Sequence, residues 1–95
     1  MDFHVYHNPI SNRFEVNLSY GLCELEYENV GINILDYKRT FVPKTLRHKG
    51  IGHKLVKEAL EYAREQHYHV KPTCPFVKKV AEESKTQYED IIIWS

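Results

Sequence analysis

Residues 39–63 decide the fold, and they read RTFVPKTLRHKGIGHKLVKEALEYA. The first part is an extended run that ends at Val42-Pro43, because proline cannot continue a sheet ladder. A basic turn with two glycines, Gly50 and Gly52, comes next. Apolar residues then recur at helical spacing, at Ile51, Leu55, Val56, Ala59, Leu60 and Ala63. The stretch therefore predicts a strand, a glycine turn and a helix with one face packed on a sheet.

The turn between this strand and this helix favours binding of an anion. Backbone N–H groups at the start of a helix carry partial positive charge, and glycines leave them unhindered. Arg47 and Lys49 add cationic side chains, so the expected ligand is multiply charged, such as a pyrophosphate. The alternative is a helix start whose glycines serve packing, but each glycine there costs about 1 kcal/mol relative to alanine.

Two familiar phosphate motifs do not fit the turn, which lacks the third glycine of the dinucleotide fingerprint and the GK[ST] ending of a P-loop. What remains is the pattern Arg-x-x-Gly-x-Gly, from Arg47 to Gly52. This pattern resembles the coenzyme A pyrophosphate loop of the GNAT superfamily of N-acetyltransferases. The match extends to a small GNAT-like family, shorter than ordinary members, in which a cysteine closes the strand after the helix. It is carried by residues 40–43, 50–56, 59–63 and 72–77, and it covers the chain from about residue 14 onward.

The resemblance implies that the cofactor is acetyl-CoA and that the reaction is acetyl transfer to an amine. The amine acceptor is not indicated by the sequence. Main-chain groups near Phe41 and Val42 would hydrogen-bond the pantetheine arm like a short added strand. The pyrophosphate would rest on backbone N–H groups of Arg47, His48, Lys49, Gly50, Ile51 and Gly52.

Cys74 is the candidate catalytic residue. It closes a predicted strand at 69–73 and precedes Pro75, which suits the first turn of a second helix running to about residue 83. Open α/β folds bind ligands at the carboxyl ends of such strands, and a helix N-terminus favours the thiolate. The resemblance places this cysteine beside the acetyl thioester, and we expect its thiol to be open to the coenzyme cleft. Residue type alone also allows a small buried hydrophobe, which is what we expect of Cys23.

The general base is not assigned. Similar proteins often carry His-Thr-Glu where this chain has Arg39-Thr40-Phe41. These changes also support an alternative function, a coenzyme A-binding or interaction module without turnover. Lys78 and Lys79 could reach a coenzyme phosphate or simply face solvent. Conceivable bases, each with a packing or surface alternative, are His48, His53, Tyr62, Tyr88 and Glu24.

The rest of the chain predicts the remaining sheet. Residues 14–19 and 22–27 alternate between apolar and polar types, as in strands with one buried face, with turns expected at Tyr20-Gly21 and at 29–31. Residues 32–42 form a longer strand whose alternation slips at Ile34-Leu35, which indicates a bulge. The two ends stay open: residues 3–6 form an edge strand or a loose arm, and residues 90–94 add a strand or cover the core.

The predicted fold is therefore α/β of GNAT type. It has a mostly antiparallel mixed sheet with a splayed parallel strand pair, packed by two helices. Residues 1–95 are expected to form a single domain.

Composition limits the partners and the compartment. Lys and Arg number 13, as do Asp and Glu, so there is no net charge to support a nucleic-acid or anionic-membrane surface. No apolar leader or long apolar run is present, so we expect a cytoplasmic protein with two free thiols. No metal is expected, because His67, His69 and Cys74 lack the spacing of a metal site. The oligomeric state is not indicated.

Overall fold

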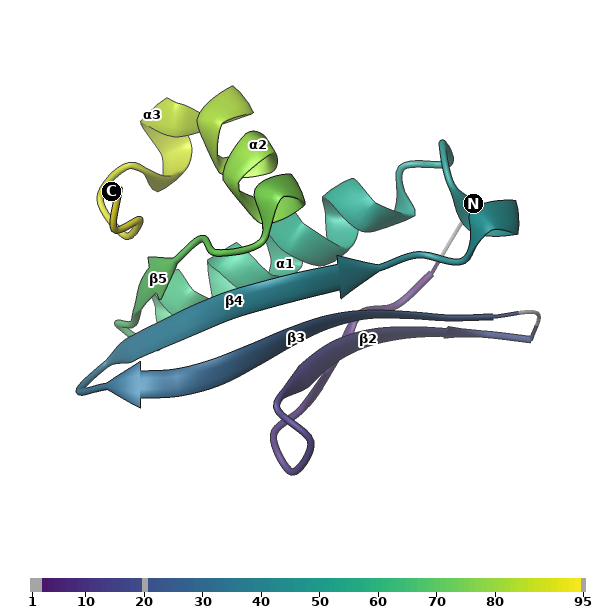
Figure 1. Cartoon of the computed structure of the whole chain (residues 1–95), viewed down its shortest axis with the longest axis horizontal. Coiled ribbons are helices and arrows are strands. Elements are labelled where there is room, and N and C mark those ends of the chain that lie inside the picture. Colours follow the sequence, from purple (N-terminus) through teal and green to yellow (C-terminus); the bar gives the residue numbers. More distant parts are fainter. Residues whose placement is uncertain (1–2, 20, 95) are drawn as a thin grey trace.

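The computed structural model describes residues 3–19 and 21–94, which form one five-stranded sheet and its covering helices (Figure 1). The strands follow chain order across the sheet, antiparallel from the first to the fourth and parallel between the last two. This arrangement confirms the predicted mixed α/β fold. The elements are β1 (Tyr6–Asn8), β2 (Arg13–Leu18), β3 (Gly21–Gly31), β4 (Ile34–Phe41), the 3₁₀ helix η1 (Lys44–Leu46), α1 (Ile51–Glu65), β5 (His69–Lys71), α2 (Pro75–Glu83) and α3 (Lys85–Tyr88).

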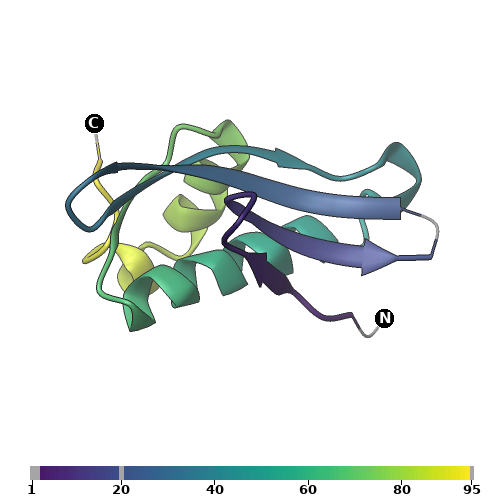
Figure 2. The same ribbon diagram turned by 90° about the horizontal axis from the view of Figure 1, so that it is seen from below.

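The helices cover one face of the sheet, and the core lies between the two layers (Figure 1). The inner face of the sheet contributes the buried side chains of Phe14, Val16, Cys23, Leu25 and Tyr37. All six apolar positions predicted for the buried face of α1 are buried. Figure 2 shows β3 and β4 running along the molecule, with the two ends of the described chain at opposite ends of it.

A β-bulge in β4 sets which side chains face the helices. Tyr37 pairs with Tyr27 and Arg39 pairs with Glu26, so Lys38 is an extra residue on β4. The extra residue shifts the alternation by one, and Thr40 opposite Leu25 takes the inner face instead of Arg39. The predicted bulge in this strand is confirmed at Lys38. A second register shift lies at Ile34-Leu35, where the alternation slips, and there the extra residue is Val30 on β3.

Several predicted element ends are wrong. The chain does not turn at residues 29–31, since β3 continues to Gly31 and the turn lies at Ile32-Asn33, where Asn33 has a φ of 57°. Asparagine tolerates this left-handed conformation, so the turn forms at Asn33. The hydrogen-bonded pairing of β3 with β4 is longer as a result. Of the two alternatives open for residues 3–6, residues 3–5 form the loose arm and the edge strand begins at Tyr6. The turn expected at Tyr20-Gly21 involves Tyr20, which lies outside the described residues.

The end of the chain adds to the free edge of the sheet. The N–H of Val70 donates to the Ile91 carbonyl at 2.8 Å, and the N–H of Ile93 donates to the Val70 carbonyl at 2.9 Å. The Ile91 and Ile92 side chains are buried, so this segment both pairs with β5 and covers the core. The short helix α3 was not predicted, and the sheet is packed by three helices instead of two.

The parallel pair separates soon after it forms. β4 and β5 pair only where residues 34–36 meet residues 69–71. One further hydrogen bond joins the Cys74 N–H to the Tyr37 carbonyl at 2.9 Å. Beyond that point β4 continues to Phe41 while the chain turns into α2 (Figure 1). The splay that the fold prediction required is therefore present.

Candidate functional site

A cleft of about 430 Å³ lies where the end of β4 meets the first turns of α1 and α2. Its lining contains side chains that carry positive charge, or acquire it on protonation, and no Asp or Glu. This absence of acids matters because the chain as a whole has no net charge. The lining residues are Thr40, Phe41, Val42, Leu46, Arg47, His48, Gly52, His53, Phe76 and Lys79.

Free backbone donors line up at the start of α1. The N–H groups of Leu46 and Arg47 are used within η1, and the first helical bond of α1 runs from the Lys54 N–H to the Gly50 carbonyl at 3.1 Å. In the part of the chain that the structure describes, the N–H groups of residues 48–53 have no acceptor. Such a row at a helix N-terminus suits an anion.

The two glycines of this turn are required for different reasons. Gly50 is the N-cap of α1 with a φ of 77°, and a Cβ built there would meet nothing within 4 Å. Its value is conformational, because side chains disfavour that backbone region. At Gly52 a Cβ would lie 3.1 Å from Cε2 of Phe76 and 3.5 Å from Cγ2 of Val42. The absence of a side chain at Gly52 therefore lets Phe76 and Val42 pack close to the backbone of α1 in the cleft.

Polar contacts fix the cationic side chains around the cleft. The Arg47 Nε donates to the Val42 carbonyl at 3.0 Å, which ties the turn to the end of β4. His53 Nε2 lies 3.3 Å from a Glu83 carboxylate oxygen, and the ring meets Phe76 edge-on at 5.2 Å between centroids. The Arg47 bond holds the turn against the end of β4, and the His53 contacts hold α1 against α2. Arg47 uses only its Nε here, so its other N–H groups remain available.

The structure gathers five of the eight residues predicted to bind the cofactor into the lining: Phe41, Val42, Arg47, His48 and Gly52. Lys49 and Gly50 are exposed and Ile51 is buried, so these three reach the site only through the backbone turn. Sequence reasoning missed Phe76 and did not rely on Lys79. Their spacing of three residues places both on one side of α2 and was a usable signal. Lys78 does not line the cleft.

Cys74 lies where predicted, as the N-cap of α2 after β5, but it is only 5% exposed and belongs to the core. The expectation that its thiol opens into the cleft is wrong for this conformation. Thr40 takes that place, because it lines the cleft and its Oγ1 lies 3.5 Å from the Cys74 sulfur. Both cysteines are free, and burial raises the pKa of the Cys23 thiol, as suits a core residue.

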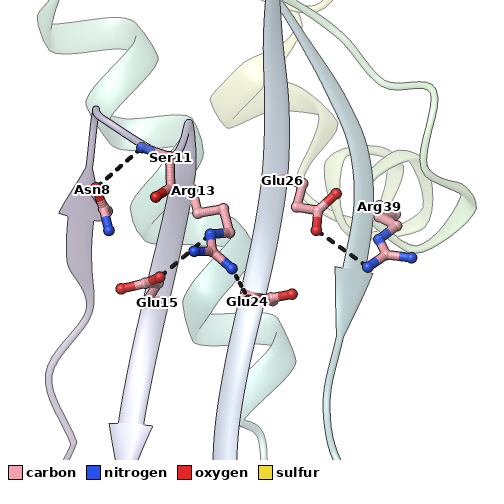
Figure 3. A network of polar contacts seen from close by, with 7 residues as sticks. All are labelled: Asn8, Ser11, Arg13, Glu15, Glu24, Glu26 and Arg39. Carbon is pink, nitrogen blue, oxygen red and sulfur yellow. Dashed lines mark hydrogen bonds and ion pairs between the residues drawn. The ribbon is translucent and has the colours of Figure 1, made fainter.

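Among the conceivable bases, His48 and His53 line the cleft. Tyr62 packs in an aromatic cluster, and burial raises the pKa values of Tyr62 and Tyr88. Glu24 lies on the sheet face away from the helices, where Arg13 donates to its carboxylate at 2.9 Å (Figure 3).

Arg39 occupies the same face as Glu24 and donates to Glu26 at 3.1 Å (Figure 3). Arg39 therefore turns away from the cleft and contributes no side chain to its lining.

Within residues 3–19 and 21–94, no three His, Cys, Asp or Glu side chains gather as metal ligands would. No helix in those residues has both the length and the apolar character needed to cross a membrane.

Comparison with known proteins gives concordant matches. A family model described as GCN5-related N-acetyl-transferase matches residues 13–91. Protein NATD1 of Homo sapiens is 33% identical over 82 residues, which cover 84% of this chain and 73% of that protein. Protein NATD1 of Danio rerio is 30% identical over 92 residues, covering 94% and 84% respectively. The solution structure of a GCN5-like protein from Staphylococcus aureus superposes with a TM-score of 0.75 at 26% identity, covering 97% of this chain and 89% of that one.

Proposed function

The chain belongs to the GCN5-related N-acetyltransferase family, and we propose that it binds acetyl-CoA in the cleft at the start of α1 and transfers the acetyl group to an amine. The observation that carries this proposal is the row of N–H groups at residues 48–53, without acceptors in the described chain, beside an acid-free cationic lining. These donors suit a pyrophosphate, which has several acceptor oxygens and a charge that favours a helix N-terminus.

The other parts of the cleft suit the rest of such a ligand. Phe41 and Val42 end β4 where β5 has already diverged, so an extended pantetheine arm has main-chain groups to pair with. Lys79 also lines the cleft and would add a cationic contact to phosphate oxygens.

The acetyl transfer has two balanced routes. In direct transfer, the amine nitrogen of the acceptor attacks the thioester carbonyl carbon, a C–N bond forms and the C–S bond to the coenzyme breaks. The coenzyme leaves as a thiol, with the proton that the amine gives up. In the second route the Cys74 sulfur attacks the same carbonyl carbon, and the C–S bond to the coenzyme breaks to release its thiol. The amine nitrogen then attacks the acetyl carbon and displaces the Cys74 thiol. Direct transfer needs no movement of Cys74, whose thiol is buried, so the geometry supports it better.

A second candidate function is a coenzyme A-binding module without turnover. The observations in its favour are that Arg39 points away from the cleft and that no carboxylate lines it in the described chain, which leaves His48 and His53 as candidates for the base. The two functions share the ligand and differ in whether coenzyme A is released.

The test is a turnover assay that measures release of the coenzyme A thiol from acetyl-CoA with a panel of primary amines and lysine peptides. We expect release that depends on the amine and on the protein. The matched variant is Gly52→Val, which narrows the cleft. NAD and ATP should not compete, because the turn carries neither of their motifs. Tight acetyl-CoA binding without amine-dependent release would favour the module, and failure of the parent to bind would refute both functions.

A further inference from the structure

Thr40 joins two features that are otherwise separate, the cleft and the buried thiol of Cys74. Thr40 lines the cleft and Cys74 does not. Its hydroxyl lies 3.5 Å from the Cys74 sulfur, where either atom can be the donor. The backbone of Cys74 is also held, because its N–H donates to the Tyr37 carbonyl at 2.9 Å and fixes the residue at the start of α2.

The β4 bulge is what gives Thr40 this position. Without the extra residue at Lys38, alternation from Leu35 and Tyr37 would place Arg39 on the inner face and Thr40 on the outer face. The bulge reverses this, and the inner position receives a small β-branched side chain with a hydroxyl. Bulges commonly redirect a side chain beside a functional site.

We propose that Thr40 is a positioning residue that shields Cys74 from the thioester and so directs the acetyl group to the amine acceptor. The inference rests on the proposed acetyl-CoA function. With Thr40 in place the acceptor nitrogen is the nucleophile that meets the carbonyl carbon. When the shield is trimmed, the Cys74 sulfur attacks that carbon, a new C–S bond forms and the C–S bond to the coenzyme breaks. Coenzyme A leaves as a thiol and takes the proton that Cys74 loses.

The test compares three variants with the parent chain. Thr40→Ala removes the shield. Thr40→Val keeps its shape without the hydroxyl. Thr86→Ala makes the same change at an exposed threonine of α3 outside the cleft lining, as a matched control. In the first arm iodoacetamide is added without acetyl-CoA, and mass spectrometry follows the peptides that contain Cys74 and Cys23. In the second arm acetyl-CoA is added without an amine, and acetylation of Cys74 is measured.

We expect Thr40→Ala to raise the rates of alkylation and acetylation of Cys74 several-fold. Thr40→Val and Thr86→Ala should resemble the parent, and Cys23 should react equally slowly in all four proteins. Thr40→Ser removes only the methyl group and should change both rates in the same direction. It serves as the second variant if Thr40→Ala folds poorly. The proposal is overturned if trimming Thr40 leaves Cys74 as slow as in the parent, or if Cys23 accelerates in step, which would indicate general loosening. Failure of the parent to bind acetyl-CoA would refute the proposed function, whereas the alkylation arm still judges the shield.

Discussion

Gly50 and Gly52 stand two positions apart in one turn, yet different forces require them. Gly50→Ala should lower the free energy of unfolding by about 1–2 kcal/mol. The φ at this position is 77°, and a residue with a Cβ disfavours this left-handed backbone conformation. Gly52→Ala carries no such backbone strain, and its Cβ would press on the movable ring of Phe76 and make an ordinary contact with Val42. Chemical denaturation of both variants measures the difference. Equal stability of Gly50→Ala and the parent would show that the turn relaxes to another conformation.

Arg47 contributes a hydrogen bond and a positive charge at the cleft, and the effect of its position can be separated from that of charge alone. Arg47→Ala should weaken acetyl-CoA binding by about 1–3 kcal/mol, because it removes a charge-assisted donor and the bond to the Val42 carbonyl. Lys49→Ala is the matched control, since it removes the same charge from a residue outside the lining. Titration calorimetry of the two variants compares them. If Lys49→Ala weakens binding as much, general charge and not the position of Arg47 explains the effect.

At the scale of elements, one buried hydrogen bond ties β4 to α1. The Tyr37 hydroxyl donates to the Ala59 carbonyl at 2.5 Å, and burial raises the pKa of Tyr37 well above its ordinary value. Tyr37→Phe keeps the ring but loses this bond, so we expect a loss of about 1 kcal/mol in the free energy of unfolding. Urea denaturation measures it. A variant as stable as the parent would mean that the hydroxyl contributes nothing net.

Elements with strong periodicity could be predicted, and their ends could not. The buried face of α1 follows from local spacing of apolar residues, so it was predictable position by position. The end of β3 depends on cross-strand pairing with β4, which competes with the turn preference of Asn29-Val30-Gly31. The exact place of the bulge depends on the same pairing.

The site shows the same division between local and long-range information. The glycine turn and Arg47 are contiguous in sequence and could be predicted. Thr40 and Lys79 join them only after β4 and α2 are brought together, and the burial of Cys74 depends on that packing. A motif therefore identifies the anion site, while the surroundings of the thiol require the folded chain.

At the scale of the whole molecule, neutrality conceals a separation of charge. Cationic groups gather at the cleft, whereas the open sheet face neutralises its glutamates with cross-strand ion pairs, such as those of Arg13 and Arg39 (Figure 3). A net charge of zero argues against a broad surface that binds polyanions, and it is compatible with a local site that binds one anion.

His7 should make stability depend on pH. Its Nε2 lies 2.6 Å from the Tyr27 hydroxyl, its ring stacks on Phe14, and burial lowers its pKa from 6.5. The unfolded chain then binds the proton more readily, so stability is fully present above about pH 6.5 and is lost as pH falls through the lowered pKa. Melting temperatures between about pH 7.5 and pH 5.5 should fall in the parent, and His7→Phe should flatten the slope.

The control for this pH dependence is His4→Phe, which changes an exposed histidine of the same segment and should keep the slope of the parent. An unchanged slope in His7→Phe would assign the pH dependence to other groups.

Calorimetric titration of acetyl-CoA into the parent, Gly52→Val and Gly31→Val tests directly whether the cleft at the start of α1 binds this coenzyme. Gly52→Val places side-chain atoms against Phe76 and Val42 in the cleft, whereas a Cβ at Gly31 makes only ordinary contacts with Ile34 at the far end of β3. We expect binding by the parent and Gly31→Val, with Kd raised by about tenfold or more in Gly52→Val, a loss of about 1.4 kcal/mol. A folded Gly52→Val variant that titrates like the parent, or a parent that does not bind, would contradict the assignment of the cleft to acetyl-CoA.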